Sequence, residues 1–127
     1  MSMAWTKNSR IRKSRDFRIV QKNGQKWKST DFLFIFLPSN HRRTSNSTQS
    51  RVGLVVSKKV GNAVIRNLVK RRIREACRKN MYGLDSDVDV VIIAFSSAKD
   101  LIQSAVDTQI ITAFERIQSR VNRKVKV

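Results

Sequence analysis

The sequence has little cysteine, few acidic residues and no long apolar run. Its single cysteine, Cys77, excludes an internal disulfide framework and a cysteine-rich zinc site. Apolar runs such as residues 90–95 are far shorter than the roughly 20 residues that a membrane span needs. No charged start is followed by an apolar stretch and a small-residue cleavage site, so we expect no signal peptide. These absences predict a soluble, cytoplasmic protein without a membrane partner.

The shortage of acidic residues leaves a large positive charge. The 127 residues include 27 Lys and Arg but only 9 Asp and Glu, for a formal net charge of +18. Such a charge destabilises a compact chain through self-repulsion, which a polyanionic partner relieves. The excess lies in residues 1–30 (net +8) and 51–80 (net +9), whereas residues 81–127 are neutral. Because 40% apolar residues suffice for a core, the pattern favours a folded nucleic-acid-binding domain over a merely solubilised surface.

Apolar periodicity predicts one folded domain over residues 14–121, between a basic, flexible segment at 1–13 and a C-terminal tail at 122–127. The charge indicates that this domain binds nucleic acid, and the resemblance described below makes it an RNA-binding domain. Three helices are expected: one at 14–23, a second from Ala63 to about Met81, and a third at 98–121. Ser14 should cap the first helix and Gly24 should end it, and a Ser97–Asp100 capping box should begin the third. Strands are expected at 27–37, 52–56 and 88–95.

The predicted order of helices and strands indicates an α+β or α/β sandwich, in which helices pack on a small sheet. The first two strands should form an antiparallel hairpin, and the third should lie parallel to the second. Residues 39–50 read as a polar loop.

The helix beginning at Ala63 carries the strongest pattern. At about 100° per residue its apolar side chains form one stripe, and most of its basic side chains form a continuous opposite face. Each like-charged pair one turn apart destabilises a helix by a few tenths of a kcal/mol. A face that accepts this is matched to phosphates, which arginine grips with two N–H groups. Arg72 departs from the pattern and should reach the rim of the helix or pair with an acid.

The block around this helix resembles the signature of the bacterial ribonuclease P protein component. It reads RVGLVVSKKVGNAVIRN over residues 51–67, followed by Lys70-Arg71 and Ile73-Arg74. The similarity extends to residues 10–17 with Gly24 and to residues 88–94. The chain departs from the family where arginine is frequent (Leu68), where an apolar residue is usual (Arg72), and at two aromatic positions (Gln21 and Ile35).

The resemblance implies an α-β-β-β-α-β-α fold with a mixed sheet and an unusually left-handed parallel crossover around the basic helix. The additional strand would come from splitting residues 25–37 or from an extension near 51–57. The implied function is that of a protein subunit of a ribonucleoprotein endonuclease, which removes the 5′ leader from precursor tRNA. The RNA subunit and its Mg²⁺ would carry the chemistry. The protein would have no catalytic residue and no metal or cofactor of its own, and it would be a monomer in isolation.

Two surfaces follow from this resemblance. One would bind the ribonuclease P RNA through Lys58, Lys59, Asn62, Arg66, Asn67, Lys70, Arg71 and Arg74. The other, a cleft between the first helix and the sheet, would hold the single-stranded leader of precursor tRNA against Phe17 and Ile35, together with Phe34 or Phe36.

Three alternatives stay open at this point. Composition and the basic helix also fit a structural RNA-binding protein of ribosomal type without a role in tRNA processing. A DNA-binding helix is disfavoured because no helix-turn-helix spacing precedes it. A metal-dependent nuclease is disfavoured too, because residues 85–89 resemble a calcium loop but lack its glycine and run directly into a strand.

Overall fold

The computed structural model describes residues 10–38, 50–80, 84 and 87–125, with side chains up to residue 121. Over these residues the order of elements is the one that the resemblance implies, and the segment at 25–37 is split into two strands. The elements are α1 (Ser14–Asn23), β1 (Gln25–Lys28), β2 (Phe32–Pro38), β3 (Arg51–Val55), α2 (Ala63–Asn80), β4 (Val88–Ala94), the 3₁₀ helix η4 (Ser96–Asp100) and α3 (Gln103–Val125).

The strands form one mixed sheet in the order β1-β2-β4-β3. Strand β2 is antiparallel to both β1 and β4, and β3 is parallel to β4. The predicted parallel pair is therefore confirmed, whereas the predicted hairpin between β2 and β3 is wrong, because β4 lies between them. Strands β2 and β4 are apolar on both faces and take the two interior positions, where helices cover both sides.

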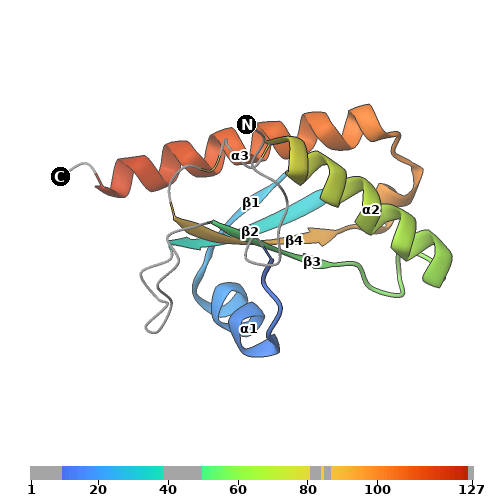
Figure 1. Ribbon diagram of the computed structural model, residues 1–127, viewed down its shortest axis with the longest axis horizontal. Helices are drawn as coiled ribbons and strands as arrows, with labels where there is room; N and C mark the ends of the chain where they lie inside the picture. The colour runs from blue at the N-terminus through green and yellow to red at the C-terminus, as the bar shows by residue number, and fades with distance from the viewer. Residues whose placement is uncertain (1–9, 39–49, 81–83, 85–86, 126–127) are drawn as a thin grey trace.

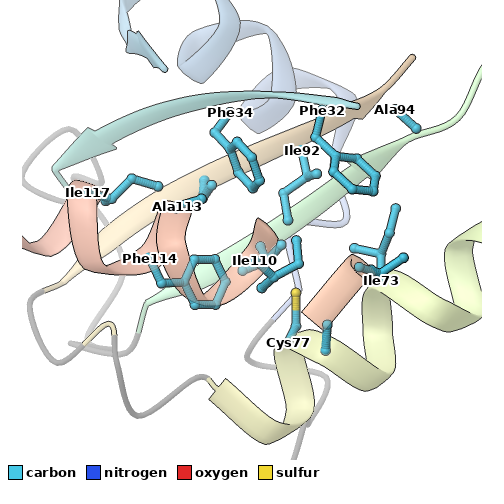
Figure 2. Packing of buried hydrophobic residues seen from close by; sticks show 14 of the residues in the cluster. Phe32, Phe34, Ile73, Cys77, Ile92, Ala94, Ile110, Ala113, Phe114 and Ile117 are labelled. Atoms are coloured by element: carbon cyan, nitrogen blue, oxygen red, sulfur yellow. The ribbon is translucent and has the colours of Figure 1, made fainter. Parts of the chain in front are cut away.

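Helices α2 and α3 cover one face of the sheet, and α1 covers the other (Figure 1). Figure 2 shows side chains of β2, β4, α2 and α3 pointing toward one another in the larger core, among them Phe32, Phe34, Ile92 and Phe114. Cys77 is fully buried there, as expected for a small packing residue. On the other face, a smaller core joins Val20 of α1 to the sheet.

Helix α1 spans the predicted residues, but its ends are built differently. The N-cap is Lys13, without a side-chain hydrogen bond, and Ser14 is already helical, so the predicted Ser14 cap is wrong. Gly24 does end the helix, with an extended backbone. A Cβ atom at this position would lie 2.6 Å from the Val20 carbonyl oxygen and 2.8 Å from that of Phe36. Glycine is thus required by the close approach of β2 to the end of α1.

Helix α3 starts five residues later than predicted, at Gln103 rather than at residue 98. Ser97 and Asp100 lie in η4, whose cap has no side-chain hydrogen bond, so the predicted capping box is absent from η4. Arg72 of α2 donates from Nη1 to the Leu101 carbonyl at 2.6 Å, and Leu101 is extended. Arg72 therefore reaches the rim of its helix, which was one of the two predicted outcomes. There it binds a backbone carbonyl rather than an acid.

The segment expected to be flexible is anchored at its end. Residues 1–9 lie outside the described residues, but Arg10 bridges to Val52, and the Ile11 N–H donates to the Val52 carbonyl at 3.0 Å. Ile11 is also buried, so these two residues are paired with β3 although they lie in the segment expected to be flexible. At the other end, α3 continues to Val125, past the predicted start of the tail.

Two further expectations concern the loop and the membrane. The predicted polar loop lies outside the described residues except for Ser50, which is buried and donates to the Leu84 carbonyl at 3.1 Å. No helix in the described ranges has the length and apolarity needed to cross a bilayer.

Candidate nucleic-acid interface

The predicted RNA-binding residues lie along α2 and the turn that precedes it. We call this set the α2 basic surface: Lys58, Lys59, Asn62, Arg66, Asn67, Lys70, Arg71 and Arg74. Its apolar back, including Val69 and Ile73, is buried in the larger core, so the helix cannot rotate to hide the charged side chains. Lys58, Lys59, Asn62, Asn67, Arg71 and Arg74 are exposed, whereas Arg66 and Lys70 are half-buried.

Asn62 has a structural task in this set. Its side-chain Oδ1 accepts a hydrogen bond from the Ile65 N–H at 3.0 Å, and its carbonyl accepts from the Arg66 N–H at 2.9 Å. These are the contacts of a helix N-cap, which typically contributes about 1 kcal/mol. Asn62 thus fixes where α2 begins, and only its amide N–H₂ group is left for a ligand.

The cations of the α2 basic surface have no acidic partners among the described residues. The ion pairs that α2 makes with described residues engage other basic groups: Arg78 pairs with Glu75, and Lys79 pairs with Asp107 of α3. Arg78 holds the pKa of the Glu75 carboxyl below its usual range. Arg66 lies next to the core, and its Nε atom is enclosed without a hydrogen-bond partner in the described structure. The positive potential of α2 is therefore left for an external anion.

The second predicted surface is only partly assembled as expected. Phe17 and Ile35 lie on the same side of the sheet, in the core beneath α1. Phe34 and Phe36 point to the opposite side and are fully buried under α2 and α3. The prediction that Phe34 or Phe36 lines the cleft is wrong, because side chains along a strand alternate between faces and only the set containing Ile35 faces α1.

Gly53 explains how the Phe17 ring reaches the sheet. A Cβ atom on Gly53 would lie 2.6 Å from the Cε1 and Cζ atoms of Phe17, so any larger residue would collide with the ring. The glycine in β3 leaves a gap into which the partly exposed ring fits. The motif RVGLVV thus carries a glycine because an aromatic side chain of another element lies on it.

Beside α1, the sheet leaves a row of side chains uncovered. Lys28, Leu33, Ile93 and Val55 are paired across β1, β2, β4 and β3, and directly opposite residues share a face. We call these four residues the open row. Its three apolar members are only partly buried, in contrast to the Ile35 and Val91 row beneath α1.

One end of the open row carries both aromatic and basic groups. The Lys28 ammonium lies 5.6 Å from the centre of the Phe95 ring, within cation–π range. At the other end, Val55 is the last residue of β3, and Lys58 and Lys59 follow in the turn to α2. The open row therefore leads into the α2 basic surface. Sequence reasoning missed Leu33, Val55 and Ile93 because a strand that is apolar on both faces does not reveal which face a helix leaves bare.

A buried ion-pair network ties α1 to the sheet. Arg51 of β3 donates from Nε and Nη2 to Asp89 of β4 at 3.0 and 2.7 Å, and from Nη1 to Asp16 of α1 at 3.3 Å. Its hydrogen bond to Asp89 raises the pKa of Arg51. Asp89 is fully buried, so its carboxylate is engaged by arginine within a strand rather than free in a calcium loop.

The described residues offer binding groups rather than an acid–base constellation. In that part of the chain, no group of three or more His, Cys, Asp and Glu side chains could hold a metal ion. Burial raises the pKa of the Cys77 thiol, which keeps it protonated and unreactive at neutral pH. What the arrangement provides is a row of free cations next to a partly apolar strip.

Comparisons with known proteins agree on one family. Residues 5–118 match the family model described as Ribonuclease P. The ribonuclease P protein component of Clostridium novyi is 36% identical over 110 residues, which are 87% of this chain and 94% of that protein. The solved ribonuclease P protein of Staphylococcus aureus superposes with a TM-score of 0.69 at 28% identity, over 94% of this chain and 96% of the other. That of Thermotoga maritima gives 0.72 at 27% identity, over 84% and 96%.

Proposed function

Because the chain belongs to the ribonuclease P protein family and acts as a subunit in tRNA processing, we propose a division of labour between its two surfaces. The α2 basic surface binds the catalytic RNA of the enzyme. The strip formed by Phe17 and the open row binds the single-stranded 5′ leader of precursor tRNA. The chemistry itself belongs to the RNA subunit and to Mg²⁺ that the RNA holds.

The observation that carries the first assignment is that Arg66, Lys70, Arg71 and Arg74 of α2 have no acidic partner among the described residues. They lie on one rigid helix whose opposite face is locked into the core. A phosphate backbone binds such a row by releasing its counterions, which requires charge but no base sequence. Asn67, exposed among the arginines, offers a donor and an acceptor for a base edge or a 2′-hydroxyl group.

The second assignment rests on chemistry that tolerates many sequences. The strip beside α1 offers the Phe17 ring, aliphatic side chains and the Lys28–Phe95 pair, all on one face of the sheet. Stacking of a base on an aromatic ring contributes about 1–3 kcal/mol and accepts any base, because each has a π face. This suits a subunit whose substrates carry different leaders.

The protein's own share is therefore binding and orientation, not bond cleavage. In this proposal it is a non-catalytic, cytoplasmic subunit that is monomeric before it meets the RNA. Mg²⁺, bound through the RNA, supplies stabilisation of the charge that develops at the cleaved phosphate. Cations at α2 lower the repulsion between RNA segments, so that less Mg²⁺ is needed for the active RNA conformation.

Reconstitution tests the proposal directly. The protein is mixed with a ribonuclease P RNA, and cleavage of precursor tRNA at low Mg²⁺ is compared with cleavage by the RNA alone. We expect strong stimulation by the wild-type protein and a reduced effect for Arg71→Gln/Arg74→Gln. Equal stimulation by the variant would overturn the assignment of α2, and no stimulation by either protein would overturn the proposed function.

A further inference from the structure

A single side chain, that of Arg51, holds α1, β3 and β4 together. Its guanidinium binds both oxygens of Asp89 and one oxygen of Asp16. Asp89 is completely buried, whereas the side chains of Arg51 and Asp16 retain 16% and 23% of their exposure. The two hydrogen bonds to Asp89 connect β3 and β4 inside the protein, and we call them the brace. The hydrogen bond to Asp16 connects the sheet to α1 near the surface, and we call it the outer arm.

This outer arm is the one side-chain hydrogen bond between α1 and the sheet in the described part of the chain. The other side-chain contacts of α1 in the smaller core are apolar, through Val20 and Phe17, and apolar attraction is non-directional. The directional bond to Asp16 adds a constraint on how the first turn of α1 is rotated.

The first turn of α1 carries the residue that matters for binding. Phe17 directly follows Asp16, and its ring lies on Gly53, two residues from Arg51 in the same strand. If the Asp16 arm were released, α1 could turn about Val20, and the ring could leave its gap or cover Val55 of the open row. The bond from Arg51 to Asp16 keeps the Phe17 ring on Gly53 and leaves the open row uncovered by α1.

We propose that Arg51 is a positioning residue for leader binding, which acts by holding Asp16 and thereby Phe17 in place. The inference rests on the proposed function of the strip beside α1. It assigns Arg51 no contact with RNA. Only arginine fits the task, because its planar fork can serve two carboxylates at once, whereas a lysine ammonium on a flexible chain cannot match the bidentate geometry at Asp89.

The variant must weaken the hold of Arg51 on α1 without damaging the sheet. Arg51→Ala would remove the two hydrogen bonds from arginine to the buried Asp89 carboxylate, a change that can unfold a domain. Asp16→Asn instead removes the charge on the outer arm and leaves the brace to Asp89 intact. Glu115→Gln is the matched control, because Glu115 is exposed on α3 and its replacement changes the net charge by the same amount.

The experiment measures the affinity of the reconstituted holoenzyme for two precursor tRNAs, one with a leader of several nucleotides and one with a single-nucleotide leader. For Asp16→Asn we expect a loss of about two- to fivefold for the long leader, the range of a partly exposed ion pair, and no loss for the short leader. Glu115→Gln should change neither. In the free protein, the nuclear Overhauser contact between the Phe17 ring and the Gly53 Hα protons should weaken in Asp16→Asn only.

The outcomes distinguish a failure of the leader assignment from a failure of the positioning role of Arg51. If wild-type holoenzyme binds both substrates equally, the leader assignment of the strip is wrong, and this inference is wrong with it. If the wild type discriminates and Asp16→Asn discriminates equally well, the leader assignment stands and the positioning role of Arg51 is refuted. Equal losses on both substrates, with a lower melting temperature, would make the network merely structural.

Discussion

The salt dependence of RNA binding measures the α2 basic surface most directly. Six of its residues are cations without an acidic partner among the described residues: Lys58, Lys59, Arg66, Lys70, Arg71 and Arg74. If each neutralises one phosphate, the logarithm of the binding constant should fall with the logarithm of salt concentration at a slope of about −4.2 to −5.4. Between about 50 and 200 mM salt the affinity should then drop roughly 300- to 2,000-fold.

The perturbation is the removal of two of these contacts in the Arg71→Gln/Arg74→Gln protein. Both side chains are exposed and absent from the core, so the melting temperature should hardly change. The slope should become shallower by about 1.4 to 1.8, in proportion to the two lost phosphates. Filter binding or fluorescence anisotropy with a ribonuclease P RNA, titrated at several salt concentrations, gives this number.

A control variant decides between a local surface and a general charge effect. Lys22→Gln/Arg116→Gln removes the same charge from exposed positions on α1 and α3. Its slope should equal that of the wild type. If both double variants lose the same slope, RNA binding follows the overall charge of +18, and the reasoning about α2 fails.

Three further predictions concern stability. Asn62→Ala should lower the free energy of unfolding by about 1 kcal/mol through loss of the α2 N-cap, whereas Asn62→Asp should not; equal loss in both would contradict the capping role, and thermal denaturation measures it. Gly53→Ala should lower the free energy of unfolding by about 1–3 kcal/mol, because the new methyl group collides with the Phe17 ring, and by less when Phe17 is also replaced by alanine. If the losses of the two single variants simply add in the double variant, the contact is disproved. Burial raises the pKa of the Cys77 thiol, so above a pH of about 8.5 the unfolded chain loses a proton that the folded chain keeps. The free energy of unfolding should therefore fall by about 1.4 kcal/mol per pH unit, and urea titrations should show this extra slope in the wild type but not in Cys77→Ala.

Local patterns were enough to predict the basic helix. Its apolar stripe and the absence of acids other than Glu75 lie within one continuous segment, and a helix places such residues by periodicity alone. The resemblance in the same segment identified the family, and so decided against a ribosomal-type protein. The N-cap role of Asn62 was missed, although asparagine is a preferred N-cap residue, and its contact with RNA stays a prediction.

The cleft was harder to predict, because it depends on contacts between distant segments. Phe34 and Ile35 are equally apolar, and only the docking of α1 decides which of the two faces it. The start of α3 shows the same limit, since Ser97 matches a capping pattern while Arg72, far away in the chain, takes the Leu101 carbonyl. The bond between Arg51 and Asp89 joins residues 38 apart, and no periodicity reveals it.

The pairing of Arg10 and Ile11 with Val52 has a consequence for how the protein behaves in concentrated solution. Strand β3 ends the sheet, and a bare outermost strand offers its amides to any neighbouring chain, which is a route to aggregation. Here the chain shields that border with its own residues, and the opposite border is a four-residue strand with two lysines. A version shortened beyond Ile11 would keep its helices and most of its charge, yet it would expose a template for intermolecular strand addition.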